Sequence, residues 1–566
     1  SLTSTQTGSN SVAVGNGALS NQLGSGNMFN IAVGPDAGAA VTTGVNNTLI
    51  GGLAGDAITT GSSNAALGYN SLGLNTTGAR NVAMGAESLS ANTTGADNVA
   101  IGEDALTANT TASNNTAVGT DSLKANTTGT NNTAVGVSAG AAVTTAGEAT
   151  LIGRHAGINL TTGSSNTFIG GRAGQNTTTA IENTAVGQAA LLTNSTGANN
   201  TALGRAALLS NTTASGNTAV GRNAMVSSTT GANNVSVGHL SLAVNTTGSS
   251  NVAIGMQCLD ANTTASNNTG VGQNALTANT TGHSNVAMGT NSLLACTTGD
   301  QNVAIGMDAL KTITGANDNV AIGREALRDN TANDNVAIGE EALKLNTSAT
   351  SNVAIGKNAM NVNTTGDENT AVGTSCLDAN TTGTDNTAMG HRALGANTTG
   401  GFNTAIGNDA LDAVSSGSNN SAVGFNALGL NTTSNNTAIG YNAAAANTSG
   451  GNVVAVGYKA LEAHTTANHV TAVGSEALKA NTTGANNSAF GTGALSSNTT
   501  ATNNTGIGFT ALNDATTGYE NTACGDEAGG SVTTGIQNVF VGQRAGNYVT
   551  TITTGNYNTY LGMATS

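Results

Sequence analysis

The chain has 566 residues, of which 8% are charged and 2% aromatic, while 78 are glycine and one is proline. Its formal net charge of −15 argues against nucleic acids and anionic membranes as partners, because such partners need basic patches. No run of 18 apolar residues that could span a bilayer occurs. Large globular cores depend on aromatic area, so this composition predicts an ordered, repetitive chain instead.

One glycine recurs along almost the whole chain with a spacing of 17 residues. Taken as position 0, it ends the motif Asn-Thr/Val-Ala-Val/Ile-Gly and falls at Gly34, Gly51 and onward to Gly542. Such a period is typical of a solenoid, in which each repeat forms one coil. We predict an all-β, parallel β-solenoid over residues 1–566, with about 33 coils of 17 residues. Residues 1–33 are the irregular first coils, 34–542 the strict repeats and 543–566 an irregular terminal coil.

The repeat divides into a strand and a turn. Two intervals have only 16 residues, those ending at Gly339 and Gly440, and both lack a residue in the Asn-Thr-Thr-Gly stretch from +7 to +10. Loops tolerate deletions better than strands do, so this stretch is the predicted turn. The residues from −4 to 0 are the predicted strand, because β-branched residues stand at −3 and −1. We expect a second short extended segment through the Ala-Leu pair at +3 and +4.

Two positions of the repeat change together, which identifies them as neighbours in the core. Seven coils have glycine instead of leucine at +4, and five have a bulky residue instead of alanine at −2. Each bulky residue follows a coil with glycine at +4, and close-packed interiors conserve volume. Positions −2 and +4 are therefore predicted to fill one compartment. These core-swap positions are Gly38, Gly55, Gly140, Gly157, Gly174, Gly529 and Gly546 at +4, and Leu49, Leu151, Phe168, Phe540 and Tyr560 at −2.

The predicted strand is apolar on both faces. Positions −1 and −3 point away from −2, because successive strand residues alternate between faces. A narrow solenoid has one interior, so the other face would expose more apolar surface than a monomer tolerates. We predict that other copies of the chain cover it along the whole shaft, although the sequence leaves open which face is the lumen and which the interface. The predicted structural core draws on both faces: Val14, Val33, Ile101, Leu106, Val118, Leu123, Ile305, Leu310, Ile338 and Leu343.

Polar residues also recur at fixed positions. Asparagines at −4 and +7 are expected to form ladders in which side-chain amides pair from coil to coil. Charged residues stand mostly at +1, +2 and +5, which indicates a solvated face. Between Gly306 and Lys344, acidic residues recur at +2 and basic residues at +5, so two facing ladders of opposite charge are expected there.

The residues that usually carry chemistry show no site pattern. Cys258 and Cys376 lie seven coils apart, roughly 33 Å at 4.8 Å per coil, which is too far for a disulfide. Three of the four cysteines are expected to be small buried residues. The six histidines form no metal-spaced set, and no nucleotide-binding loop or nucleophile elbow occurs. We expect no catalytic, cofactor-binding or metal site, and no enzyme activity.

The repeat resembles those of known fibre proteins. Residues Asn98 to Gly102, Asn-Val-Ala-Ile-Gly, are similar to the signature in the head domains of trimeric autotransporter adhesins. The whole unit, for example Asn115 through Thr130, more closely resembles the NTAxGxxALxxNTTG repeats of phage tail-fibre and related cell-surface fibre proteins, and the match covers nearly all of residues 10–562. The resemblance implies a left-handed β-roll in a homotrimeric shaft. In tail fibres such repeats often precede a self-cleaving chaperone, and an end at Ser566 fits its removal.

These features lead to two main functional hypotheses. The first is the shaft of a bacteriophage tail fibre that mediates adhesion to a host surface; the second is a bacterial trimeric adhesin head or extracellular filament subunit. Both place the chain on a virion or at a cell surface, with further copies of itself and a glycan or protein receptor as partners. An ice-binding solenoid is a minor third hypothesis, since threonines recur at +8 and +9. Residues 34–57, 136–176 and 525–562 are the candidate receptor regions, unless they only repack the core.

Overall fold

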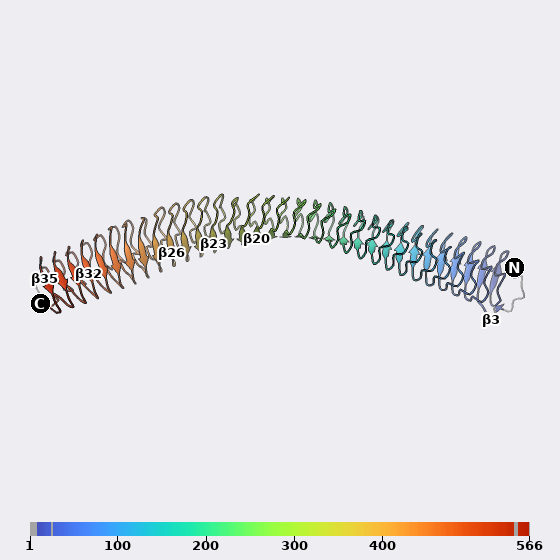
Figure 1. Ribbon diagram of the computed structural model, residues 1–566, viewed down its shortest axis with the longest axis horizontal. Coiled ribbons are helices and arrows are strands. Elements are labelled where there is room, and N and C mark those ends of the chain that lie inside the picture. Colours follow the sequence, from blue (N-terminus) through green and yellow to red (C-terminus); the bar gives the residue numbers. More distant parts are fainter. Residues whose placement is uncertain (1–7, 24–25, 548–552, 565–566) are drawn as a thin grey trace. The chain divides into compact units, whose positions relative to one another are not determined.

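The computed structural model describes residues 8–23, 26–547 and 553–564. It divides into two units, Ser1–Ser284 and Asn285–Ser566, and each is a stack of coils joined by parallel strands (Figure 1). No helix occurs in these described ranges, so none could cross a membrane. The predicted all-β parallel solenoid with about 17 residues per coil is confirmed.

Each coil contributes one short strand at positions −3 to −1. In the first unit, a small parallel pair, β1 (Gly8–Ser9) and β3 (Gly26–Asn27), accompanies the main sheet. The main strands of this unit are β2 (Val12–Val14), β4 (Ile31–Val33), β5 (Thr48–Ile50), β6 (Ala65–Leu67), β7 (Val82–Met84), β8 (Val99–Ile101), β9 (Thr116–Val118), β10 (Thr133–Val135), β11 (Thr150–Ile152), β12 (Thr167–Ile169), β13 (Thr184–Val186), β14 (Thr201–Leu203), β15 (Thr218–Val220), β16 (Val235–Val237), β17 (Val252–Ile254) and β18 (Thr269–Val271). Those of the second unit are β19 (Val286–Met288), β20 (Val303–Ile305), β21 (Val320–Ile322), β22 (Val336–Ile338), β23 (Val353–Ile355), β24 (Thr370–Val372), β25 (Thr387–Met389), β26 (Thr404–Ile406), β27 (Ser421–Val423), β28 (Thr437–Ile439), β29 (Val454–Val456), β30 (Thr471–Val473), β31 (Ser488–Phe490), β32 (Thr505–Ile507), β33 (Thr522–Cys524), β34 (Val539–Val541) and β35 (Thr559–Leu561).

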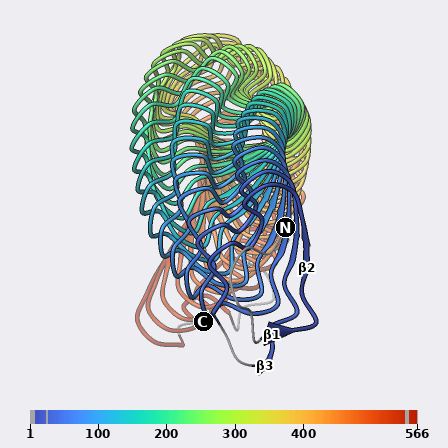
Figure 2. The same cartoon turned by 90° about the vertical axis from the view of Figure 1, so that its right-hand side faces the viewer.

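Neighbouring strands pair in parallel and in register, so residues one repeat apart stand over one another. Ala100 of β8, for example, pairs with Ala117 of β9. The two 16-residue intervals keep this register, because Ala321 pairs with Ala337 and β27 likewise pairs in register with β28. The missing residue comes from the turn, as predicted. Figure 2 looks along the first coils, which follow one another as similar loops.

From Gly34 onward, the rest of each coil contains no second strand within the described residues. Positions +2 and +4 both have left-handed backbone, as at Asp104 (φ 60°) and Leu106 (φ 54°), so the predicted extended segment through +3 and +4 is wrong. These turns are still bonded from coil to coil: Leu106 N donates to Ser122 O at 3.0 Å. Left-handed backbone costs a leucine roughly 1–2 kcal/mol, and burial of its side chain, worth about 1.5–3 kcal/mol, offsets that cost.

The glycine at position 0 is required for two reasons. Its φ lies in the left-handed half of the map, as at Gly238 (φ 137°). A Cβ on Gly238 would also lie 2.4 Å from the carbonyl oxygen of Gly255, the equivalent residue of the next coil. Strain and steric overlap therefore both exclude a side chain, which explains why the glycine recurs in every coil.

In each unit the core is a lumen lined by positions −2, +3 and +4. Leu106, Leu123, Leu310 and Leu343 are fully buried, as are the alanines at −2. The predicted exchange of volume is confirmed by contact, since a Cβ on Gly140 would lie 2.5 Å from the Leu151 side chain. The other glycines at +4 face Leu49, Phe168 and Phe540 in the same way, namely Gly38, Gly55, Gly157, Gly174 and Gly529. Gly546 is buried as well, and Tyr560 is half-buried, with its ring stacked on Phe540 at 5.4 Å.

A third position takes part in this exchange. In coils with glycine at +4, the asparagine at +7 is often replaced by a buried aliphatic residue: Val41, Ile58, Val143, Leu160 or Val532. A Cβ on Gly55 would lie 2.7 Å from Ile58 Cδ1, so the +7 side chain fills part of the space that leucine leaves.

The predicted core needs one correction. The residues at −1 lie on the outer face of the sheet: Val14, Val33 and Ile101 are 56%, 36% and 37% exposed, and Val118, Ile305 and Ile338 are partly exposed. The lumen has room only for −2, +3, +4 and parts of the turn, because each coil is narrow. The structure thus decides which strand face is the lumen, and −1 does not belong to the core of the single chain.

We expect Gly238→Ala to lower the free energy of unfolding by about 2–4 kcal/mol, through left-handed strain and overlap with Gly255. Gly52→Ala is the matched control, because its Cβ would meet only Tyr69 at an ordinary 3.7 Å. Chemical denaturation of both variants measures the difference. Equal stabilities would contradict the stacking geometry.

A double-mutant cycle tests the shared compartment. Leu151→Ala leaves a cavity and should cost about 2–5 kcal/mol, while Gly140→Leu overfills the lumen and should cost about 1–3 kcal/mol. Together they move toward the common repeat, so the double variant should lose at least about 1 kcal/mol less than the sum. Strictly additive losses in chemical denaturation would argue that the two positions do not share space.

Candidate functional surfaces

The longest exposed feature of each unit is an apolar stripe on the outer face of its sheet. It consists of position −1, which is apolar in every coil, flanked by position −3, which is Val, Ile, Ala, Thr or Ser; the two positions are hereafter the outer stripe. Ile254 in the first unit and Met288 in the second are both 39% exposed. In the first unit, the small Ala65 leaves a shallow apolar hollow beside Leu67 and Met84. Covering a side chain exposed to this extent is worth about 1 kcal/mol, so covering many coils is worth as much as association costs, about 4–15 kcal/mol.

Two buried asparagine ladders bond neighbouring coils, as predicted. At −4, Asn98 Oδ1 accepts a hydrogen bond from Asn115 N at 3.0 Å, and Asn98 Nδ2 donates to Ala112 O at 2.9 Å. At +7, Asn109 Nδ2 donates to Asn92 Oδ1 at 2.8 Å and to Ala112 O at 3.0 Å. Buried polar groups without partners are costly, so these amides serve the stack and are not open to a ligand.

Opposite charges face each other in the second unit where the sequence predicts them. Lys344 Nζ lies 2.6 Å from Glu325 Oε2, and Arg328 lies 3.0 Å from the same carboxylate. Hydrogen bonding from Lys344 lowers the pKa of Glu325. Lys311 and Asp308 form the equivalent pair one coil earlier, at 3.3 Å. Pairs on a solvated face each contribute roughly 0–1 kcal/mol, so this network adds little to stability.

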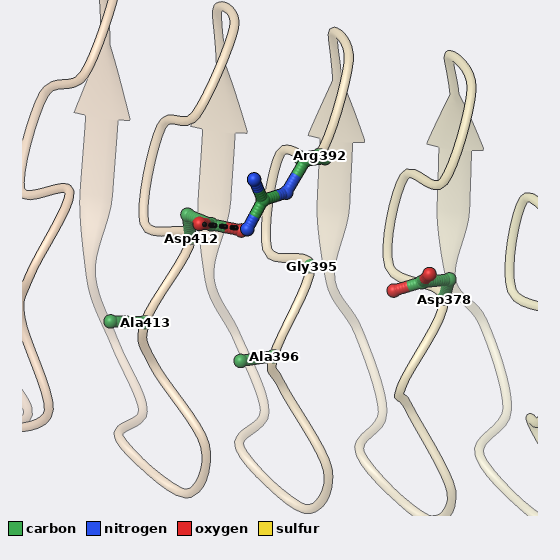
Figure 3. Close-up of a pocket in the computed structure, with 6 residues that line it drawn as sticks. All are labelled: Asp378, Arg392, Gly395, Ala396, Asp412 and Ala413. Atoms are coloured by element: carbon green, nitrogen blue, oxygen red, sulfur yellow. Dashed lines mark hydrogen bonds and ion pairs between the residues drawn. The ribbon is translucent and has the colours of Figure 1, made fainter.

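Hollows on the second unit occur where glycine replaces a side chain at +5. The hollow in Figure 3 lies at Gly395, between Asp378 and Asp412, and Arg392 donates to Asp412 Oδ2 at 2.8 Å across it. Burial raises the pKa of both aspartates. A second hollow lies at Gly530, beside Phe509 and Glu527, and so touches the candidate region 525–562.

The Gly395 hollow has no side chain that could act as a nucleophile beside its carboxylates. Its lining consists of Asp378, Arg392, Gly395, Ala396, Asp412 and Ala413. Within the described ranges, no cluster of three His, Cys, Asp or Glu side chains could hold a metal ion. The hollow can offer hydrogen bonds and charge from Arg392 and its two carboxylates.

Sequence reasoning missed an aromatic ladder in the second unit. Phe425, Tyr441 and Tyr458 stand at +1 of successive coils, with ring centroids 5.3 and 5.6 Å apart and planes 13° and 17° from parallel. The amine of Lys459 lies 5.6 Å from the Tyr458 ring. The signal was three aromatic residues in successive +1 positions. Because the rings cover one another's faces, they mainly stabilise the stack.

Three cysteines are buried and one, Cys524, is exposed, as the sequence predicts. Burial raises the pKa of Cys258 and Cys376 to about 12 and that of Cys296 to about 11. A thiol with so high a pKa holds its proton at neutral pH and is a poor nucleophile. None of these three is suited to catalysis.

His464 replaces asparagine in the +7 ladder. Its ring is fully buried, Nε2 lies 3.0 Å from Ala467 O, and Asn481 Nδ2 lies 3.2 Å from Nδ1. This pattern suits a neutral ring that donates from Nε2 and accepts at Nδ1. Burial lowers the pKa of His464. By contrast, His239 and His391 are exposed at +1, as predicted.

We expect His464 to make the stability of the second unit depend on pH. Its folded pKa lies below the ordinary 6.5, so below that pH the unfolded chain binds the proton first and the free energy of unfolding falls. His464→Asn restores the common ladder residue and should remove this loss. Denaturation between about pH 7.5 and pH 5 measures it, with His469→Asn, an exposed turn residue, as the control. An unchanged pH profile in His464→Asn would contradict the buried neutral ring.

No family model matches the chain. No curated protein matches its sequence at a significant level. A functional assignment therefore depends on the stacked coils and their surfaces.

Proposed function

We propose that the chain is a non-enzymatic structural fibre segment, the shaft of a bacteriophage tail fibre that mediates attachment to a host surface. The observation that carries the proposal is the outer stripe, which continues over coil after coil of each unit beside a fully packed lumen. A stack of this kind is suited to a structural role, because it holds surface side chains at a fixed spacing. The resemblance of the repeat to tail-fibre repeats supports the same role.

The outer stripe supports self-association through further copies of the same chain. Position −1 is apolar in every coil of both units, position −3 is Val, Ile, Ala, Thr or Ser, and no charged residue stands at either. A patch this long exceeds the few hundred Å² that soluble monomers usually expose. Identical copies have identical stripes in the same register, so like stripes can cover one another along the shaft. We propose three copies, as the resemblance implies.

A bacterial adhesin head or extracellular filament subunit is the second candidate, because the same stacked coil would serve it. The gene sequence beyond Ser566 distinguishes the two: a self-cleaving chaperone favours the tail fibre, and a membrane β-barrel anchor favours the adhesin. Ice binding has less support. The threonine hydroxyls at +8 bond to the next coil, as Thr110 Oγ1 does to Thr127 O at 3.2 Å, and so are not free to order water.

The native mass of the purified chain tests self-association. We expect three copies, and we expect Ile254→Glu combined with Ile355→Glu to raise the concentration at which the assembly dissociates at least about tenfold, because charges would be buried between stripes. Met256→Glu with Met307→Glu is the matched control, since these residues at +1 are 43% and 46% exposed but lie outside the stripe. Light scattering over a dilution series gives both quantities. A single copy at every concentration would contradict the proposal.

A further inference from the structure

Four arginines in the first unit differ from every other cationic side chain of the protein. Within the part of the chain that the structure describes, all six lysines and the other arginines form ion pairs. Arg154, Arg172, Arg205 and Arg222 form none, and all four are exposed. They are also the only lysines or arginines between residues 125 and 310. We call these four residues the basic ridge.

The basic ridge lies on one side of the coil stack. Arg154, Arg205 and Arg222 occupy +1, and Arg172 occupies the adjoining +2. At about 4.8 Å per coil, the ridge extends over roughly 19 Å. His239 follows at +1 in the next coil after Arg222 and is exposed too, but it interacts electrostatically with Asp260 at +5 and so lies outside the basic ridge.

Acidic residues are absent from positions +1, +2 and +5 of the coils that carry the four arginines. Between Asp121 and Asp260 the only ones are Glu148 and Glu182, both at −5. A strand separates −5 from +1, which places these carboxylates roughly 15–20 Å from the ridge. That exceeds the screening length of about 8 Å at physiological salt, so they do not neutralise it. The protein as a whole has a charge of −15, which makes this local excess of positive charge more unusual.

Like charges in successive coils repel, and elsewhere the chain compensates for this. The acidic column that includes Glu325 and Glu341 faces the basic column that includes Lys344. Arg205 and Arg222 stand in successive coils without such a facing column, because +5 holds Leu209 and Val226. Within the chain nothing offsets their repulsion, so an anion from outside is the natural counter-charge.

The ridge also has room for a ligand. Gly171 takes the +1 position between Arg154 and Gln188, and a Cβ there would meet nothing within 4 Å. Arg172 adjoins this gap, and its Nε donates to Gln175 Oε1 at 2.9 Å, which holds the guanidinium in place. Planar guanidinium groups bind carboxylate and sulfate through paired hydrogen bonds.

We propose that the basic ridge binds a linear acidic polysaccharide whose sugars carry carboxylate or sulfate groups. An extended chain parallel to the stack can reach all four arginines, whereas a small anion cannot span them. Nucleic acid fits less well, because no aromatic residue stands at +1 or +2 between Arg154 and His239 to stack on bases. This inference rests on the proposed attachment function and names the receptor chemistry for it.

The test uses the purified full-length assembly and four immobilised polymers: dextran sulfate, polygalacturonate, duplex DNA and neutral dextran. We expect binding to at least one acidic polymer over dextran, weakening as salt rises. Arg205→Gln with Arg222→Gln should lower the affinity at least about tenfold; Gln188 shows that the +1 position accepts glutamine. Arg80→Gln with Arg544→Gln removes the same charge from paired arginines and should change affinity less than about twofold.

Three outcomes would contradict the proposal that the basic ridge binds an acidic polysaccharide. They are equal binding to dextran, equal or tighter binding to duplex DNA, and an equal loss in the paired-arginine control. Native mass and adhesion of the chain to host cells are measured in parallel. If the Arg205→Gln/Arg222→Gln variant still adheres to cells, the ridge is not the receptor site, but the proposed attachment function stands. If the unaltered chain adheres to no cell, the proposed attachment function itself is contradicted.

Discussion

The close approach of one coil's backbone to the next is the constraint on which the rest of the structure depends. At position 0, a glycine Cα faces the carbonyl of the next glycine so closely that any Cβ would overlap it, as at Gly238 and Gly255. Parallel hydrogen bonding fixes the spacing of the coils at about 4.8 Å, and at that spacing position 0 has no room for a side chain. A side chain at this position would push the neighbouring coils apart and disturb their pairing. The chain therefore repeats this glycine while it changes almost every exposed residue.

In such a stack each coil stabilises its neighbours and is stabilised by them. Asn98 and Asn115 bond from one coil to the next, and Leu106 N donates to the coil that follows. Stability in such an array is a sum of nearest-neighbour terms. Local replacements are consequently repaired locally: Gly140 admits Leu151, and Val143 fills what remains. His464 likewise enters the +7 ladder by keeping one donor and one acceptor.

How much could be predicted from the sequence follows from the same logic. The strand, the turn, the ladders and the exchange between Gly140 and Leu151 were all predictable, because a strict period reports which residues are stacked. The backbone at Leu106 was not, because a buried leucine in a left-handed turn and one in a strand have the same pattern. The outward direction of Ile101 was undecided, since an apolar residue suits a lumen and an interface equally well. That Arg205 lacks an ion pair could not be predicted either, because it becomes evident only when the structure shows which carboxylates the other lysines and arginines contact.

Separation of inner from outer positions has a consequence for function. The residues at 0, −2, −4, +4 and +7 maintain the stack, and a change at any of them requires a compensating change nearby. Positions +1, +2 and +5 contact little beyond solvent and one another, within a coil and from coil to coil, so they can change at small cost. The aromatic ladder of Phe425, the hollow at Gly395 and the basic ridge all lie there. Since the inner positions are common to every coil, the capacity to discriminate between partners has to come from these outer columns, where neighbouring coils combine single side chains into surfaces that no one coil could form.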